Sequence, residues 1–356
     1  MRYLCRLFGI MVVTLSACTP VSNDGEIITV KSCDFNDWSS LMEIKGIVEF
    51  QDTLPAPYLS VANKCIVGRE QILFWDYKAK LVYAYNMEGK YLFTVGGIGR
   101  AENEYVDISD VAFSPNQKEI QVLDKSGIKI YNSNDGQFLR KRLFHGMESS
   151  TIKGFLPCNE NSYLLFTPDN EYSICKIDSN DHVTPLRKRK GYQMVSNRFT
   201  QTNGHHAILP DYGHFTIDYE KDNQIIPAYT IDFGEVSLPQ GMIPEDYGSF
   251  IQIDDTKDYF KSVLDYYENN KYIYASIVGP NQTYYNFLFS KTDGRIYVGP
   301  HDDKTNLVVV GMDNTYLYGL VYPEYVKAES QYYNLFKSYI DSGVHNPLFV
   351  KIALSL

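Results

Sequence analysis

Six polar side chains between positions 100 and 110 have the chemistry of a ligand site: Arg100, Glu102, Glu104, Tyr105, Asp107 and Asp110. A guanidinium group and carboxylates form charge-assisted hydrogen bonds, and a tyrosine adds a hydroxyl group and a ring face. The apolar run at 106–113 predicts an innermost strand that contains Asp107 and Asp110. We expect the six side chains to bind a ligand at the mouth of a central channel. The alternative is a salt-bridged loop beside a solvated channel wall.

Cys18 is a candidate for lipidation. Residues 1–17 begin with a short basic region, continue with the apolar stretch 7–15 and end in Leu-Ser-Ala, directly before Cys18. The order is that of a signal peptide, and the apolar stretch is too short to span a bilayer. The last four residues resemble a bacterial lipobox, in which cleavage leaves a lipidated cysteine as the mature N-terminus. We therefore expect a signal peptide at 1–17, a polar tether at 18–26 and a lipid membrane as partner of Cys18. We therefore expect the protein to be exported and anchored in the outer membrane. The sequence does not decide whether it is attached to the leaflet that faces the periplasm or to the leaflet at the cell surface.

The remaining cysteines and the histidines predict neither a metal site nor a cofactor. Adjacent side chains of a strand point to opposite faces, so only one of His205 and His206 can join His214. The cysteine spacing is not that of a zinc ribbon or a redox motif. We expect mostly buried thiols, with residues 158 and 175 as the favoured pair if a disulfide forms. The cysteines are Cys33, Cys65, Cys158 and Cys175.

The composition favours a globular β protein and argues against a nucleic-acid partner. The 356 residues are 44% hydrophobic and 21% charged, which excludes a disordered chain. Tyrosine (30) and phenylalanine (19) are abundant, and both favour strands. The formal net charge is −10, and the short basic run at 187–190 does not offset it. Duplex binding depends on neutralised phosphates, so we expect no nucleic acid.

A repeated unit predicts the architecture. Short apolar runs alternate with turn residues every 8–12 positions. Two stretches of the sequence align with each other. In each, a first strand ends in an aspartate, Asp76 or Asp124, and a short loop leads to a second strand that ends in Tyr-Asn. A turn with a glycine then leads to a third strand, which begins with an aromatic residue followed by leucine. The offset of a little under 50 residues fits one four-stranded propeller blade. Weaker copies follow, so we expect one all-β domain at 27–356, a six-bladed β-propeller with antiparallel blades.

Three further segments complete the predicted ring. A strand within 43–50 is expected to share a blade with the last strand, which follows Asn346. This pairing would join the two ends of the chain, as ring closure requires. The segments 256–267 and 330–340 break the strand pattern, and we expect them to form short helices that cap blade edges.

The run at 89–105 resembles a Gly-Lys-Phe-Leu…Gly-x-Gly-Pro-Gly-Glu-Tyr signature. The chain is therefore identified as similar to the six-bladed β-propeller lipoproteins of Bacteroidetes, which are related to NHL-repeat propellers. The lipobox at Cys18 and the terminal strand from Asn346 are similar to that family too. The sequence departs from the pattern at 100–103, where Arg-Ala-Glu-Asn replaces Gly-Pro-Gly. The resemblance implies an exported propeller lipoprotein and supplies no catalytic residue.

The leading function is a binding or scaffold module of the cell envelope for a glycan, peptide or protein partner. The alternative is an enzyme, a lyase or hydrolase of sugar or lactone-like substrates, with its site at one end of the channel. The Gly-x-Ser-x-Gly and HExxH signatures are missing from the sequence. The alternative requires two or more histidine, aspartate, glutamate or arginine side chains that converge on one channel end, with or without a metal. The simplest test is whether histidines meet carboxylates at one channel mouth. The candidate histidines are His145, His205, His214 and His301.

Overall fold

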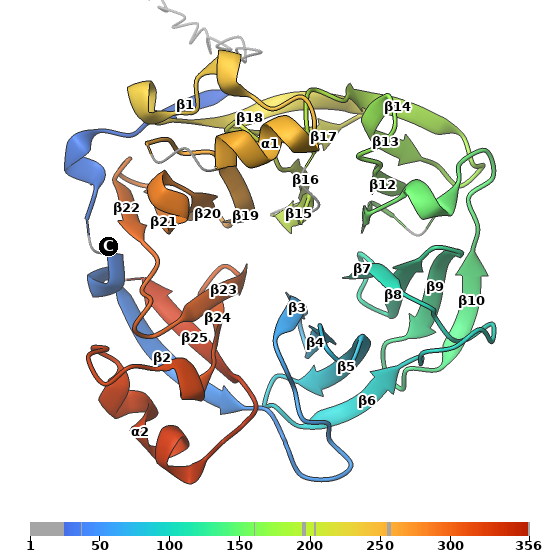
Figure 1. Ribbon diagram of the computed structural model, residues 1–356. Helices are drawn as coiled ribbons and strands as arrows, with labels where there is room; N and C mark the ends of the chain where they lie inside the picture. The colour runs from blue at the N-terminus through green and yellow to red at the C-terminus, as the bar shows by residue number, and fades with distance from the viewer. Residues whose placement is uncertain are drawn as a thin grey trace, which may run out of the picture.

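The computed structural model describes residues 25–36, 38–159, 161–193, 197–202, 204–254 and 258–354. The predicted signal peptide at 1–17, Cys18 and most of the tether lie outside the described residues. The described chain forms a ring of six sheets around a central channel (Figure 1). This is the predicted six-bladed β-propeller. Within the described residues, no helix is long and apolar enough to cross a membrane.

The blades are numbered here in chain order, and their strands are given from the channel outward. Blade 1 holds β3 (Ala62–Val67), β4 (Gln71–Asp76), β5 (Leu81–Asn86) and β6 (Tyr91–Val95). Blade 2 holds β7 (Ile108–Phe113), β8 (Glu119–Asp124), β9 (Gly127–Asn132) and β10 (Phe138–Arg142). Blade 3 holds β11 (Gly154–Pro157), β12 (Tyr163–Phe166), β13 (Tyr172–Ile177) and β14 (Val183–Lys188).

The other three blades continue the ring. Blade 4 holds β15 (Phe199–Thr202), β16 (His205–Ile208), β17 (Thr216–Lys221), β18 (Gln224–Asp232) and, outermost, β1 (Glu26–Thr29). Blade 5 holds β19 (Ser262–Glu268), β20 (Tyr272–Val278), β21 (Tyr284–Ser290) and β22 (Ile296–Pro300). Blade 6 holds β23 (Leu307–Met312), β24 (Leu317–Val321), β25 (Leu348–Leu354) and β2 (Met42–Glu49).

The apolar core lies between the blades. Among the described residues, each of six clusters of buried side chains combines residues of two neighbouring blades. In β4, Leu73 packs toward blade 2, whereas Ile72 and Phe74 pack toward blade 6. Both faces of the middle strands are therefore buried, and successive side chains serve opposite faces. This explains the continuous apolar runs of the repeat.

The aspartate that ends the second strand of each repeat holds the following turn. Asp76 accepts hydrogen bonds from the backbone amides of Ser60 (2.5 Å) and Ala79 (2.7 Å). Asp124 accepts one from the amide of Ser126 at 2.7 Å. An aspartate at this position satisfies turn amides that would otherwise lack partners. The aspartate therefore recurs in the two aligned repeats because it stabilises the backbone around the turn.

An N-terminal belt (residues 25–36 and 38–49) runs along the rim of three blades (Figure 1). Its first strand, β1, pairs in parallel with β18 of blade 4. Phe35 then forms a bridge with Val298 in β22 of blade 5. Finally β2 pairs with β25 of blade 6, which confirms the predicted closure between the two ends of the chain. The fifth strand of blade 4 was not predicted.

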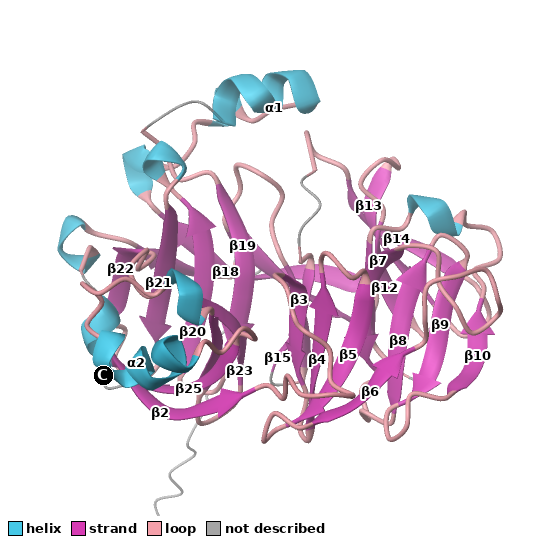
Figure 2. Ribbon diagram, turned by 60° about the horizontal axis from the view of Figure 1, so that its bottom comes forward, coloured by secondary structure: helices cyan, strands magenta, loops and turns pink. Residues whose placement is uncertain are grey.

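Two short helices flank the ring. α2 (Tyr333–Ser342) confirms the helix predicted at 330–340, and its Phe336 is buried against the core between blades 5 and 6. The helix predicted at 256–267 is wrong in position. The helix α1 occupies Tyr247–Asp254, and from Ser262 the chain forms β19, the innermost strand of blade 5. α1 lies in the connection that leads into β19 and stands above one face of the ring (Figure 2).

We expect alanine in place of Asn346 to lower the free energy of unfolding by about 2 kcal/mol, because buried amides without partners cost roughly 1–3 kcal/mol. The fully buried side chain of Asn346 accepts a hydrogen bond from the amide of Leu59 (2.7 Å) and donates to the carbonyl of Pro57 (3.3 Å). It thereby joins the last strand to blade 1. Chemical denaturation measures the change. Alanine at the exposed Asn334 should change stability by less than about 0.5 kcal/mol, and an equal loss there would contradict the assignment.

Candidate functional site

Four polar side chains, called the polar belt below, cross the central channel at the level of the innermost strands: Lys64, Asp110, Asn197 and Asp265. Lys64 of β3 donates a hydrogen bond to Asp110 of β7 at 2.7 Å. Asn197, just ahead of β15, donates to Asp265 of β19 at 3.0 Å. The four side chains come from four blades. They bring two carboxylates, an ammonium group and an amide to the axis of the ring.

Asp110 is held firmly in this belt. Its second carboxylate oxygen accepts a hydrogen bond from the amide of Phe155 in β11 at 3.0 Å. The same side chain therefore joins blades 1, 2 and 3. A carboxylate with these partners is well suited to hold the channel wall in shape.

Asp265 is the second carboxyl group of the belt, and it lines the smaller cavity. Burial raises its pKa, while the hydrogen bond from Asn197 and the charge of Lys64 act in the opposite direction. A cation or a hydrogen-bond donor that reaches this carboxyl group would find an acceptor in an environment with little water.

Two cavities open on either side of the belt. The one at the end where the innermost strands begin has a volume of about 790 Å³, and the one at the opposite end has about 450 Å³. Lys64 and Asn197 line both. The second cavity is lined largely by the far ends of the innermost strands, among them Phe113, Thr202 and Met312. The belt therefore separates two chemically different mouths.

The larger cavity is lined by many lysines, and it is called the lysine mouth below. Its cationic residues are Lys64, Lys78, Lys80, Lys125 and Lys153. Its carboxylates are Asp107 and Asp110, and Trp75 and Tyr77 add aromatic surface. Tyr77 is exposed (66%), so its ring is available to a ligand. The connection with α1 leads to the same end of the channel.

The structure places two of the six predicted site residues at this mouth, Asp107 and Asp110. The others lie in the preceding loop and do not line the lysine mouth. Tyr105 is fully buried and donates a hydrogen bond to the carbonyl of Val95 at 2.9 Å. Glu104 accepts one from the amide of Ala101 at 2.9 Å, which stabilises the loop. Arg100 and Glu102 are exposed.

Sequence reasoning missed the lysines because they come from separate turns and strands. Lys78 and Lys80 belong to the turn after Asp76, and Lys125 belongs to the equivalent turn after Asp124. The repeat alignment carried this signal, because a lysine follows the aspartate in both copies. Lys153 directly precedes β11 and had no sequence signal of its own.

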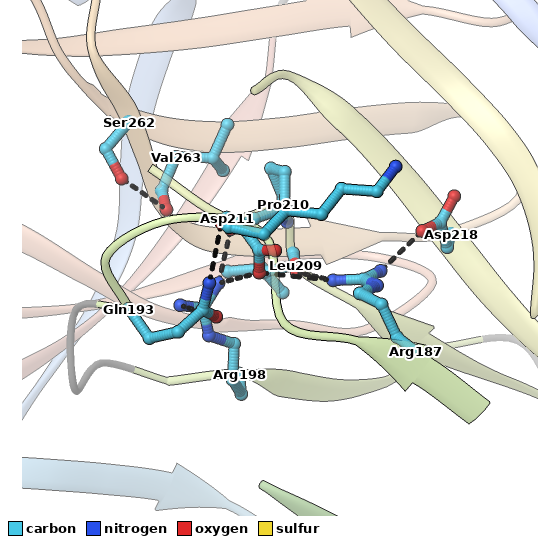
Figure 3. Close-up of polar contacts among 10 residues, drawn as sticks. Arg187, Gln193, Arg198, Leu209, Pro210, Asp211, Asp218, Ser262 and Val263 are labelled. Carbon is cyan, nitrogen blue, oxygen red and sulfur yellow. Dashed lines mark hydrogen bonds and ion pairs between the residues drawn. The ribbon is translucent and has the colours of Figure 1, made fainter. Parts of the chain in front are cut away.

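A buried network of charges supports the segment that carries Asn197 (Figure 3). Arg198 lies over the ring of Phe166 at 4.7 Å, donates to the carbonyl of Pro210 and faces Asp211 at 3.6 Å. Burial lowers the pKa of Arg198 to about 10, against the charge of Asp211. Arg187 reaches the same Asp211 at 3.6 Å, so the network links blades 3 and 4.

The histidines are scattered over the ring. Among the described residues, none lines the lysine mouth or the opposite cavity. His145 lies 4.0 Å from Asp181, and His205 stacks on Tyr219 with 4.7 Å between ring centroids. His214 and His301 are half-buried, and burial lowers the pKa of both. In the described part of the chain, the candidate histidines therefore do not meet carboxylates at either of these cavities.

The four described cysteines are free thiols, so Cys158 and Cys175 are not joined. Cys65 and Cys175 are buried, as expected, whereas Cys33 is exposed. His206 does not meet His214; it lies 3.3 Å from Glu220, with Cys158 close by. This group lies between blades 3 and 4, away from the channel mouths.

The fold and the sequence both match known propellers. A family model described as DUF5128, 6-bladed beta-propeller, matches residues 19–313. A search of curated proteins finds no relative of the chain. A solved Bacteroides fragilis protein that is named as exported is 16% identical, with a TM-score of 0.74 over 92% of this chain and 99% of that one. A DUF4221 member from Bacteroides vulgatus is 12% identical, with a TM-score of 0.58 over 87% and 97%.

Proposed function

Because the chain belongs to the DUF5128 family of six-bladed β-propellers, we propose that it uses its channel as a binding module of the cell envelope. A lipid on Cys18 holds it at the membrane, and the lysine mouth takes an acidic glycan. The ligand carries carboxylate or sulfate groups that meet the lysines, and sugar rings that stack on Trp75 and Tyr77.

The charge of the lysine mouth supports this proposal most strongly. The chain as a whole has a formal net charge of −10, yet five lysines and only two carboxylates line this cavity. Asp110 is already paired with Lys64. A ring of ammonium groups around a concave site raises the local concentration of anions. The ligand class is therefore acidic.

The aromatic surface favours a glycan among acidic ligands. Trp75 and Tyr77 lie at the end of β4 and in the turn that also carries Lys78 and Lys80. An aromatic face next to an ammonium group suits a sugar ring with a charged substituent, because the ring face is apolar and the substituent is not. A cavity of about 790 Å³ is of the size that small-molecule sites have.

The sequence and one relative support placement at the envelope. Residues 1–18 have the order of a lipoprotein signal, and the Bacteroides fragilis relative is named as exported. The enzyme alternative has no comparable support, because the described histidines do not meet carboxylates at a channel mouth. The binding module is therefore the function we propose.

We expect glutamine at Lys78, Lys80 and Lys125 together to weaken binding of an acidic oligosaccharide on the order of tenfold or more, since each exposed charge contact contributes roughly 0.2–1 kcal/mol. A glycan array with uronate, sulfated and neutral oligosaccharides identifies the ligand, and calorimetry then measures the affinity at two salt concentrations. Binding should weaken as salt rises.

A matched control removes the same number of charges elsewhere. Glutamine at the exposed Lys90, Lys118 and Lys221 should leave the affinity unchanged. Preference for neutral glycans, or the same loss in both triple variants, would show that the lysine mouth is not the binding site.

A further inference from the structure

Three side chains of different chemistry meet at the junction of blades 3 and 4. Cys158 directly follows β11, His206 lies in β16 and Glu220 lies in β17. Their sulfur, imidazole nitrogen and carboxylate oxygen all lie within 4.8 Å of one another. His206 and Glu220 are cross-strand partners in register, so the sheet itself presents both to the facing thiol. Sulfur, nitrogen and oxygen donors together are the set that zinc binds in proteins.

The distances suit a tetrahedral ion. His206 Nδ1 lies 3.3 Å from Glu220 Oε2. Zinc bonds of about 2.0–2.1 Å to nitrogen and oxygen at a tetrahedral angle place two such ligands about 3.3 Å apart. The pair therefore needs almost no movement to bind one ion. The Cys158 sulfur lies within 4.8 Å of both atoms, and a zinc–sulfur bond of about 2.3 Å would require it about 3.6 Å from each of them.

The carboxylate is already oriented by other groups. Glu220 Oε1 accepts hydrogen bonds from Lys176 Nζ at 2.8 Å and from the amide of Asn223 at 3.0 Å. Oε2 therefore remains directed at His206. Partners of this kind around a ligand fix its orientation, as the outer shell of metal sites does. Lys176 also compensates part of the negative charge that a thiolate and a carboxylate would bring.

One of the three side chains borders a cavity. Cys158 lines a cavity of about 410 Å³ together with Glu119, Arg140 and Asn159, whereas His206 and Glu220 do not line it. A water molecule would supply the fourth ligand of a zinc ion held by three side chains. The cavity is distinct from the lysine mouth, which lies at the other end of β11 near Lys153.

We propose that Cys158, His206 and Glu220 bind a zinc ion that joins blades 3 and 4. The thiol proton is released to solvent when the sulfur binds, and no bond is oxidised or reduced. The ion links the segment after β11 to two strands of the next blade. It is independent of the acidic-glycan site, so either proposal can fail without the other.

Zinc titration of the metal-free full chain tests the proposal. We expect one zinc ion per chain by calorimetry and by metal analysis, with no comparable binding of magnesium. Cobalt in place of zinc should give the absorption band of a thiolate ligand. Cys158→Ser should remove that band, and Cys158→Ser and His206→Gln should each weaken zinc binding at least tenfold.

Two control variants separate this site from adventitious binding. Cys33→Ser changes an exposed thiol, and His205→Ala changes the neighbouring histidine that stacks on Tyr219. Both should bind zinc like the wild type. Thermal unfolding without metal should be the same for Cys158→Ser and the wild type, which excludes misfolding as the cause. Absence of one-to-one binding, or unchanged affinity in both site variants, would overturn the proposal.

Discussion

Alanine in place of Glu268 should lower the free energy of unfolding of the propeller by about 3–5 kcal/mol, as removal of one partner from a buried ion pair does. The carboxylate of Glu268 is buried at the end of β19 and forms an ion pair with Lys291. It accepts hydrogen bonds from Tyr266 (2.8 Å) and, across the blade junction, from Thr202 (3.2 Å) and Tyr219. Alanine would leave all of these donors without their acceptor.

Denaturant unfolding at neutral pH measures this loss. Glu43→Ala is the matched control, because Glu43 pairs with Lys45 at the exposed surface and should change stability by less than about 1 kcal/mol. A loss below that value for the Glu268 variant would show that the buried network is not a major support of the junction between blades 4 and 5.

The stability that the Glu268 carboxylate contributes should depend on pH. Burial alone would raise the pKa of Glu268, but the hydrogen bonds from Lys291, Tyr219 and Tyr266 outweigh it, and the pKa lies below its usual value. A lowered pKa contributes stability above the pKa of the unfolded chain, about 4.3 for glutamate. This contribution is lost as the pH falls through the pKa of the folded state. The difference between wild type and variant should therefore narrow in acid.

Cys18→Ala should abolish lipid attachment altogether, because only a thiol accepts the lipid at this position. The protein should then accumulate as an uncleaved precursor or leave the membrane fraction. The propeller should fold unchanged, since the first strand, β1, begins at Glu26. Labelled palmitate in the producing cell measures the attachment. Two or more acyl chains give stable anchoring, so the expected effect is complete loss and not a partial one.

Cys33→Ala serves as the control for this experiment. Cys33 is an exposed thiol within the described chain, and its replacement should leave the label and the membrane fraction unchanged. Equal palmitate label in the wild type and the Cys18 variant would remove the lipoprotein from the proposed function. The propeller fold and the lysine mouth would not be affected by that result.

The outer three strands of most blades could be predicted from the sequence, because the middle strands are buried on both faces and the outermost strands follow them after short turns. Long apolar runs and the turn aspartates Asp76 and Asp124 marked them. The innermost strands were harder to predict. β11 and β15 have four residues each, too few for an alternating pattern, and β19 was taken for a helix. β1 was missed because a short parallel edge strand depends on the partner it meets.

The candidate site shows a similar division. Asp107 and Asp110 were predicted at a channel mouth because they lie directly before and within one recognisable innermost strand, β7. The lysines that surround them come from separate turns and strands, so no single stretch of the sequence contains them. Lys64 meets Asp110 only because two blades place their innermost strands side by side. The lysine mouth could not be predicted from the sequence, because its residues come together only in the folded ring.

The pairing of β2 with β25 also sets an order of folding. β2 is synthesised early, yet its partner, Leu348–Leu354, lies far downstream in the sequence and is made after all the other strands of the ring. Until then blade 6 lacks two of its four strands, and the edge of β24 has no partner. Contacts this distant in sequence form slowly, and an open strand edge invites pairing with other chains. The pairing of β2 with β25 therefore makes ring closure depend on the C-terminal strand, because a polypeptide that lacks β25 leaves the ring open.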